Sequence, residues 1–441
     1  MTTSAISRDA SPLPARAPSH DDAPRSGSAS GAATLLLAFM WGAYFLNYCD
    51  RQAVFAMFPA LKNDLAMSDS QLGYVGAVFL WIYALGCPLA GVLGDRISKR
   101  LLAVGSLVVW SLVTLATGWA RTGTDILALR GAMGISESLF MPTAIALTAN
   151  AHPPALRSRA IAILTTAQIA GTVAGSVFGG RMADAGRWRD AFWMLGILGV
   201  AYAVPYFLFL RGVRETPAEA TSATPSARAP SSLVWSLFGA PSFPVLCVVF
   251  PCFVFGLWLI YGWLPTFLHD KFDLSQANAA WNATVYLQSA TAVGLLGGGF
   301  LSDWLYRRSA AARQWVLVAS LFCSAPSLYL IGAGETLPAT RLAAAAFGLS
   351  SGLFMGNIFA AGFEVVPAGL RATAVGVLNL FGGMVSGFAT LFGGMWKESI
   401  GIDGLLAATA LAYLAAGALL AVVTGAYFAT DHARATAESS P

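Results

Sequence analysis

The chain has 441 residues, of which 56% are hydrophobic and 11% are charged, less than half of the roughly 25% charged residues usual in soluble proteins. This composition excludes a string of soluble domains, and the apolar content excludes disorder outside the chain ends. The net charge of +4 comes from basic residues in short loops, which form no stripe for nucleic acid. We therefore expect an all-α polytopic protein that lies in the lipid bilayer.

Apolar runs predict twelve transmembrane helices in two halves. Residues 1–32 are polar and lack a signal-peptide core, so we expect a disordered cytoplasmic tail. A six-helix bundle over 33–211 is followed by a cytoplasmic linker at 212–240, a second six-helix bundle over 241–428 and a tail at 429–441. The predicted spans are 33–58, 72–93, 101–119, 126–149, 160–182, 191–210, 243–268, 279–301, 314–333, 342–365, 372–394 and 404–428.

Lysine and arginine residues set the expected orientation. With the N-terminus inside, the inner segments hold sixteen of the 26 basic residues, the outer loops hold eight, and two lie within spans. Because basic residues accumulate on the cytoplasmic side, both termini are predicted to be cytoplasmic. We expect a monomer in the plasma membrane, which in a bacterium is the inner membrane.

The two halves resemble each other in sequence. Residues 156–180 align without gaps to residues 370–394, with seven identities in 25 positions and an offset of 214. At the same offset, Gly134-Ile-Ser-Glu-Ser-Leu-Phe-Met faces Gly348-Leu-Ser-Ser-Gly-Leu-Phe-Met. Duplicated six-helix halves are typical of transporters that bind their substrate near the membrane midplane, between the halves.

Two related loop segments extend this pattern. GVLGDRISKR follows the second span at 91–100, and GFLSDWLYRR follows the eighth span at 299–308. Both resemble the loop motif of the major facilitator superfamily, Gly-x-x-x-Asp-Arg followed by basic residues. The resemblance implies that fold and a conformational gate in which glycine permits close helix approach and the aspartate pairs across the halves. The gate residues are Gly91, Asp95, Arg96, Arg100, Gly299, Asp303 and Arg307.

Spans 1 and 4 narrow the resemblance. NYCDR at 47–51 and RGAMGISESLFMP at 130–142 are similar to the anion:cation symporter branch, which moves sugar acids and other organic anions with protons or sodium. Spinster-like lipid transporters share much of the pattern. Pro142 is typical of the organic-anion branch, whereas Ser138 stands where that branch commonly has glycine. The alternative is a spinster-like or multidrug-type facilitator or exporter of lysolipids or amphiphiles.

Four ionisable residues fall well inside the spans, where each costs about 2.5–3.5 kcal/mol on insertion scales. They are Asp50, Arg51, Arg130 and Glu137. We predict that Asp50 and Glu137 couple protons, since a carboxyl in hydrocarbon is costly when ionised, and that Arg51 and Arg130 bind a substrate carboxylate through their planar donors. The structural alternatives are a fixed Asp50–Arg130 pair and a permanent pairing of Arg51 with Asp50 or Glu137.

The resemblance also implies that several polar residues line the substrate site. Their alternative role is hydrogen bonding between helices. They are Tyr48, Asn47, Tyr83, Gln168 and Asn379. The five cysteines lie inside apolar runs without metal-ligand spacing, and the four histidines are scattered. We therefore expect no metal, no cofactor and no enzymatic activity.

Overall fold

The computed structural model describes residues 26–212 and 237–438, which are almost entirely helical. Nine of the described helices are long and apolar enough to cross a membrane. The other three predicted crossings are occupied by α1 (Ser26–Ala53), by α11 (Gln276–Tyr306) and by α5 (Gly123–Ser138) followed by α6 (Phe140–Ala151). The expected all-α polytopic fold is confirmed.

The remaining helices follow in chain order. A 3₁₀ turn, η2 (Phe55–Met57), joins α1 to the short α2 (Phe58–Asp64), and η3 (Ala368–Leu370) precedes α14. The long helices are α3 (Asp69–Arg96), α4 (Lys99–Thr117), α7 (Pro154–Asp184), α8 (Trp188–Gly212), α10 (Ser242–Phe272), α12 (Ala312–Ala333), α13 (Leu337–Glu364), α14 (Arg371–Met395) and α15 (Gly401–Ala437).

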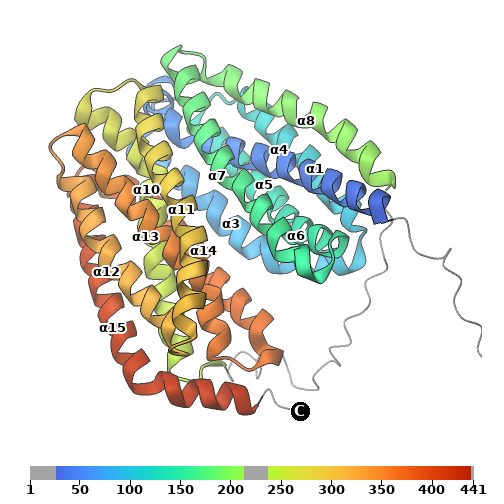
Figure 1. The fold of residues 1–441 in the computed structure, drawn as a ribbon. Helices are drawn as coiled ribbons and strands as arrows, with labels where there is room; N and C mark the ends of the chain where they lie inside the picture. Colours follow the sequence, from blue (N-terminus) through green and yellow to red (C-terminus); the bar gives the residue numbers. More distant parts are fainter. Residues whose placement is uncertain (1–25, 213–236, 439–441) are drawn as a thin grey trace, which may run out of the picture.

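Two helices extend into regions predicted as tails. α1 begins at Ser26, within the predicted tail 1–32, and α15 continues to Ala437, within the predicted tail 429–441. The last turns of α15 bend across the base of the C-terminal bundle (Figure 1). They are held there because the Asp431 carboxylate accepts from the backbone N–H of Ser242 (2.9 Å) and Arg434 donates to the carbonyl of Gly239 (3.1 Å). Residues 1–25 and 439–441 and most of the linker, 213–236, lie outside the described residues.

Helix starts follow ordinary capping chemistry. Ser68 and Gln71 form a capping box at the start of α3, and Thr122 and Asp125 form another at the start of α5. The backbone N–H groups of Arg121 and Thr122 donate to the exposed Asp125 carboxyl and so lower its pKa. These local signals fix where two helices of the N-terminal half begin.

A glycine stripe brings α1 and α7 into close contact. A Cβ atom at Gly171, Gly175 or Gly179 would strike a backbone carbonyl oxygen of α1, namely that of Phe45, Cys49 and Ala53 respectively. Small residues every fourth position allow such close approach of membrane helices. The stripe therefore sets the position of the segment of α1 that carries the predicted charged residues.

We predict that Gly175→Leu displaces α1 and destabilises the protein, because overpacking a close contact costs about 1–3 kcal/mol and here the obstacle is backbone. Thermal unfolding of the purified protein should show a transition several degrees lower, together with loss of transport. Gly105→Leu is the matched control, since nothing lies within 4 Å of a Cβ atom there. Equal behaviour of the two variants would contradict the assigned role of the stripe.

The internal duplication is visible in the packing. Gly134 of α5 faces the carbonyl oxygen of Phe79 in α3, and Gly348 of α13 faces that of Leu287 in α11. These two glycines are the pair that the sequence repeat aligns. Equivalent helices of the two halves thus cross at equivalent glycines.

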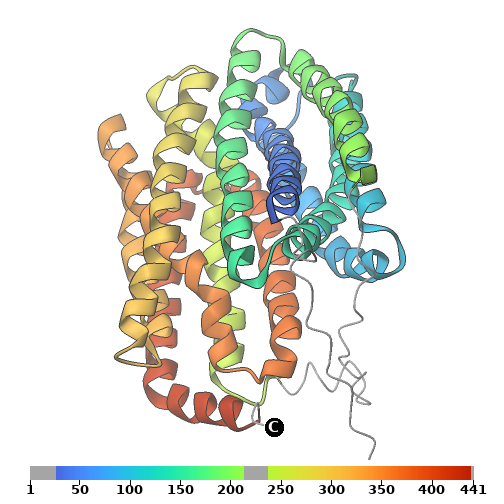
Figure 2. The same ribbon diagram turned by 45° about the vertical axis from the view of Figure 1, so that its right-hand side comes forward.

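The two halves meet at the end of the molecule opposite to the described chain ends (Figures 1 and 2). The Asp184 carboxylate of α7 accepts from the first N–H groups of α11, at Gln276 (2.7 Å) and Ala277 (2.9 Å). A carboxylate at a helix N-terminus is stabilised by the unpaired N–H groups. Further along the interface, Trp81 of α3 donates to the carbonyl of Met384 in α14 (2.9 Å). These contacts close that end of the molecule.

Candidate functional site

Two helix ends place the central side chains. α1 ends at Ala53, two residues after Arg51, and α5 ends at Ser138, immediately after Glu137. The last carbonyl groups of a helix lack partners within it, so polar side chains gather at such breaks. The two breaks bring the charged ends of α1 and α5 together inside the N-terminal half.

Arg51 and Glu137 form a buried ion pair. Arg51 Nη2 lies 2.6 Å and Nε lies 3.2 Å from the same oxygen, Glu137 Oε2. The side chains are 4% and 0% exposed. Removing one partner of such a pair leaves an uncompensated buried charge, which costs about 3–5 kcal/mol. Each of the two buried groups therefore needs an oppositely charged partner, which is either the other side chain or a charged group that replaces it.

Aromatic rings surround the Arg51 guanidinium. Its central carbon lies 4.6 Å from the ring centre of Tyr48, 4.8 Å from that of Phe79 and 4.9 Å from that of Tyr83. The Arg51 guanidinium also donates to the Tyr48 hydroxyl and to Asn47 Oδ1, each at 3.4 Å. Cation–π contacts hold the planar group in place without neutralising it. Arg51 is thus oriented by its neighbours, and among the described residues Glu137 alone supplies the opposing charge through a direct contact.

Arg130 has a different environment from the one expected. Its Nη2 donates to the backbone carbonyl of Arg51 (3.1 Å) and its Nη1 contacts the sulfur of Met133 (3.0 Å). No direct ion pair links Arg130 to Asp50 within residues 26–212 and 237–438, although the two groups are close enough to interact electrostatically. A fixed Asp50–Arg130 pair therefore stays a prediction. Arg130 caps the end of α1, because the Arg51 carbonyl lies within its last turn.

Asp50 makes no direct contact with the carboxylate or guanidinium of the Glu137–Arg51 pair among the described residues. Its Oδ2 accepts from the Thr114 hydroxyl of α4 (3.2 Å), and its Oδ1 has no hydrogen-bond partner in the described part of the chain. A buried carboxylate with one weak donor is costly when ionised. Asp50 therefore has the setting of a group that carries a proton or loses its charge on burial.

The other predicted polar residues divide into two groups. Asn47, Tyr48 and Tyr83 contact Arg51, and Gln168 of α7 accepts from the Tyr44 hydroxyl of α1 (3.0 Å) next to them. Asn379 is exposed on α14 and forms no hydrogen bond with this cluster in the described part of the chain. The structure therefore brings together the N-terminal candidates and leaves Asn379 apart in this conformation.

Three further contact residues were not singled out from the sequence. Phe79 faces both arginines, with its ring centre 5.6 Å from the guanidinium of Arg130. Thr114 bonds Asp50, and Met133 accepts from Arg130. Thr114 could have been recognised from the sequence, because it is a polar residue in an apolar span. Phe79 and Met133 could not, because in the sequence they resemble ordinary core residues.

The predicted gate residues lie at the far ends of the helices. Asp303 pairs with Arg313 of the same half (2.9 Å), and Arg313 also pairs with Glu364 at the end of α13 (2.5 Å). Nothing lies within 4 Å of a Cβ atom at Gly299, so the expected close helix approach is absent there. Asp303 thus pairs within its half rather than across the halves, because the halves meet at the opposite end.

The first copy of the gate sequence is only partly described. Arg100 donates to the carbonyl of Leu210 at the end of α8 (3.2 Å), which also stays within one half. Arg307 is exposed. The surroundings of Gly91 and the side chains of Asp95 and Arg96 lie outside what the structure describes, so their role in a gate stays a prediction.

Comparison with known families decides the class of the protein. The model of the Major Facilitator Superfamily matches residues 40–390. The chain belongs to this superfamily. It is therefore a multi-pass membrane transporter and not an enzyme. Among the described residues, no three His, Cys, Asp or Glu side chains form a group that could hold a metal ion.

Individual relatives point to the same class. The chain is 30% identical over 301 residues to a hexuronate transporter of Bacillus subtilis, covering 66% of this chain and 70% of the relative. It is 27% identical over 396 residues, or 86% of each chain, to a probable sulfoacetate transporter of Cupriavidus necator. The structure of a bacterial homologue of the human lysosomal transporter spinster, inward-facing and unoccupied, matches with a TM-score of 0.74 at 20% identity. That match covers 93% of this chain and 99% of the other. It shows the shared fold.

Proposed function

We propose that this transporter imports a small organic anion, such as a sugar acid or another carboxylate, together with protons by alternating access. The observation that carries the proposal is the buried ion pair of Arg51 and Glu137, whose charged atoms lie 2.6 Å apart inside the N-terminal half. Arg51 is held by aromatic rings, and its directly contacting counter-charge is one titratable carboxylate. A substrate carboxylate can take the place of that carboxylate.

Charge balance explains how such a site couples the two species. In the empty site, the guanidinium of Arg51 neutralises Glu137. When a proton from outside binds the Glu137 carboxylate, the resulting neutral acid releases Arg51, whose donors then bind the substrate carboxylate. Empty and loaded sites therefore carry the same net charge. A site holding the anion without the proton would bury an extra negative charge, which is costly in a membrane interior.

Asp50 and Arg130 support this site in the proposed cycle. Asp50 is the candidate for a second proton, since its Oδ1 lacks a donor in the part of the chain described. Arg130 Nε is likewise a buried donor without a partner among the described residues. A substrate oxygen that reaches this group would satisfy it.

The closed end of the molecule, formed by Asp184 and the start of α11, is assigned to the outer face. With that assignment both termini are cytoplasmic, the structure faces inward, and the protein lies in the inner membrane of a bacterium as a monomer. Two of its relatives are named for anions, hexuronate and sulfoacetate, which supports an anionic cargo. A spinster-like facilitator or exporter of lysolipids or amphiphiles is the alternative, because spinster homologues are also among the relatives of this chain.

Transport by reconstituted vesicles tests the proposal. With an imposed pH gradient that is alkaline inside, radiolabelled glucuronate should accumulate above its external concentration, and a pH dye should report proton entry when it is added. Neutral glucose should not accumulate. If glucuronate accumulates with a sodium gradient but not with a pH gradient, sodium and not the proton is the coupling ion. Movement of labelled lysophospholipid but of no carboxylate would overturn the proposal in favour of the amphiphile alternative.

A further inference from the structure

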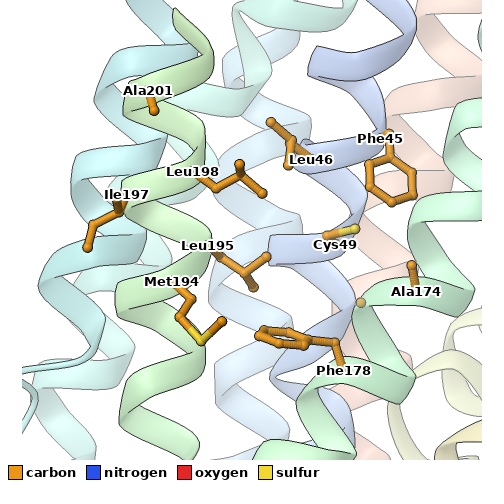
Figure 3. A pocket seen from close by; sticks show the side chains of 11 residues that line it. Phe45, Leu46, Cys49, Ala174, Phe178, Met194, Leu195, Ile197, Leu198 and Ala201 are labelled. Carbon is orange, nitrogen blue, oxygen red and sulfur yellow. The ribbon is translucent and has the colours of Figure 1, made fainter.

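An apolar cavity of about 550 Å³ lies between α1, α7 and α8. Figure 3 shows Phe45 and Cys49 of α1, Phe178 of α7, and Leu195 and Leu198 of α8 around it. No lining residue carries a charged or amide side chain. Its volume is in the range of about 300–1,000 Å³ common for ligand sites. The cavity is large enough for a ligand but offers nothing to hold a carboxylate.

The cavity is separate from the charged site. Cys49 lines the cavity, whereas Arg51, two residues further along α1, contacts Glu137 of α5. Residues two apart on a helix point in widely different directions. The anion site and the cavity therefore lie on different faces of α1.

The cavity opens toward the bilayer. Three of its lining residues on α8 are strongly exposed, Met194 at 52%, Ile197 at 60% and Leu198 at 52%. In a membrane-spanning bundle, an exposed apolar helix face contacts lipid. Lipid is consequently the neighbour with direct access to the cavity.

A cation stands one helical turn beyond the cavity. Arg181 of α7 is exposed and follows the lining residues Ala174 and Phe178 by seven and three positions, so all three share one face of the helix. Arg181 lies three residues before the end of α7, at the level where a lipid headgroup is expected. A guanidinium binds phosphate well through its planar donors.

We propose that the cavity binds one acyl chain of a phospholipid, from the leaflet at the Asp184 end of the molecule, with the lipid phosphate at Arg181. The apolar lining accommodates the chain, and Arg181 supplies the complementary charge for the headgroup. Such a lipid would contact α1 at Cys49, on the face of the helix opposite to Arg51. The proposal does not depend on which substrate the transporter carries.

Photo-cross-linking tests the site without a transport assay. The protein is reconstituted in vesicles that contain phosphatidylglycerol with a diazirine in the middle of one acyl chain. After irradiation, mass spectrometry should find cross-links at residues 45–49, 174–178 and 194–201 at least fivefold more often than on the exposed face of α15. Uniform labelling of both faces would mean annular lipid only and would overturn the proposal.

Variants separate the cavity from the surrounding surface. Ala201→Trp and Leu198→Trp fill the cavity from its rim and should lower this labelling at least fivefold. Ala418→Trp changes an exposed alanine of α15 and should leave it unchanged. Arg181→Gln should lower labelling by the phospholipid, but not by a diazirine-bearing fatty alcohol without phosphate. Unchanged labelling in Arg181→Gln would overturn the headgroup assignment, and unchanged labelling in both tryptophan variants would overturn the acyl-chain site.

Discussion

Glu137→Gln should abolish proton-driven accumulation of the substrate while leaving exchange of substrate across the membrane intact. Glutamine keeps an oxygen that can accept from Arg51 Nη2, which lies 2.6 Å from Glu137 Oε2 in the wild type. It cannot bind and release a proton, so its charge no longer changes during the cycle. We expect accumulation under a pH gradient to fall at least tenfold. Counterflow, measured in vesicles preloaded with unlabelled substrate, should persist because Arg51 no longer has to be freed from a negative charge.

A second buried carboxylate provides the control. Glu364 is also an acid paired with an arginine, Arg313 at 2.5 Å, but it lies at the end of α13 away from the site. Glu364→Gln should retain gradient-driven accumulation. Asp50→Asn tests whether Asp50 binds a second transported proton. If it does, fewer protons should enter per substrate molecule in this variant than in the wild type. Full accumulation by Glu137→Gln would show that the coupling carboxylate is elsewhere.

The helices could be predicted from the sequence because apolar runs of sufficient length have few other structures available in a bilayer. The positions of their interruptions were harder to predict. α5 ends at Ser138, four residues before Pro142, and η2 begins at Phe55, four residues before Pro59. A proline has no N–H to bond the carbonyl four residues back, and its ring clashes with that carbonyl. Proline alone does not decide, because Pro88 and Pro205 lie inside the unbroken helices α3 and α8. Tertiary partners also contribute, such as Arg130, which donates to the carbonyl of Arg51.

The sequence indicated which charged residues lie inside the membrane-spanning helices, but not how they pair. The cost of charge in hydrocarbon singled out Asp50, Arg51, Arg130 and Glu137, and the structure places all four in one half. Which acid meets which base depends on helix rotation and on a fraction of a helical turn, which a sequence pattern does not specify. Asn379 shows the same limit, since it lies apart from the cluster in this conformation and an encounter would require movement of the two halves.

Arg51→Lys should weaken substrate binding about 10- to 100-fold while the fold is retained. Lysine keeps the charge but loses the planar donor set and its stacking against the rings of Tyr48, Phe79 and Tyr83, 4.6–4.9 Å away. Hydrogen bonds to charged groups contribute about 1.5–3 kcal/mol, and each 1.4 kcal/mol is a factor of about ten in affinity.

The binding change should appear as a higher ligand concentration for half-maximal thermal stabilisation, because a ligand of the folded state raises its stability by mass action. Arg189→Lys is the matched control. Arg189 is a partly exposed arginine at the start of α8, and it pairs with Asp64 (3.5 Å). Arg189→Lys should bind like the wild type. If Arg51→Lys also binds carboxylates like the wild type, the guanidinium is not the group that holds the substrate, and Arg51 serves only to neutralise Glu137.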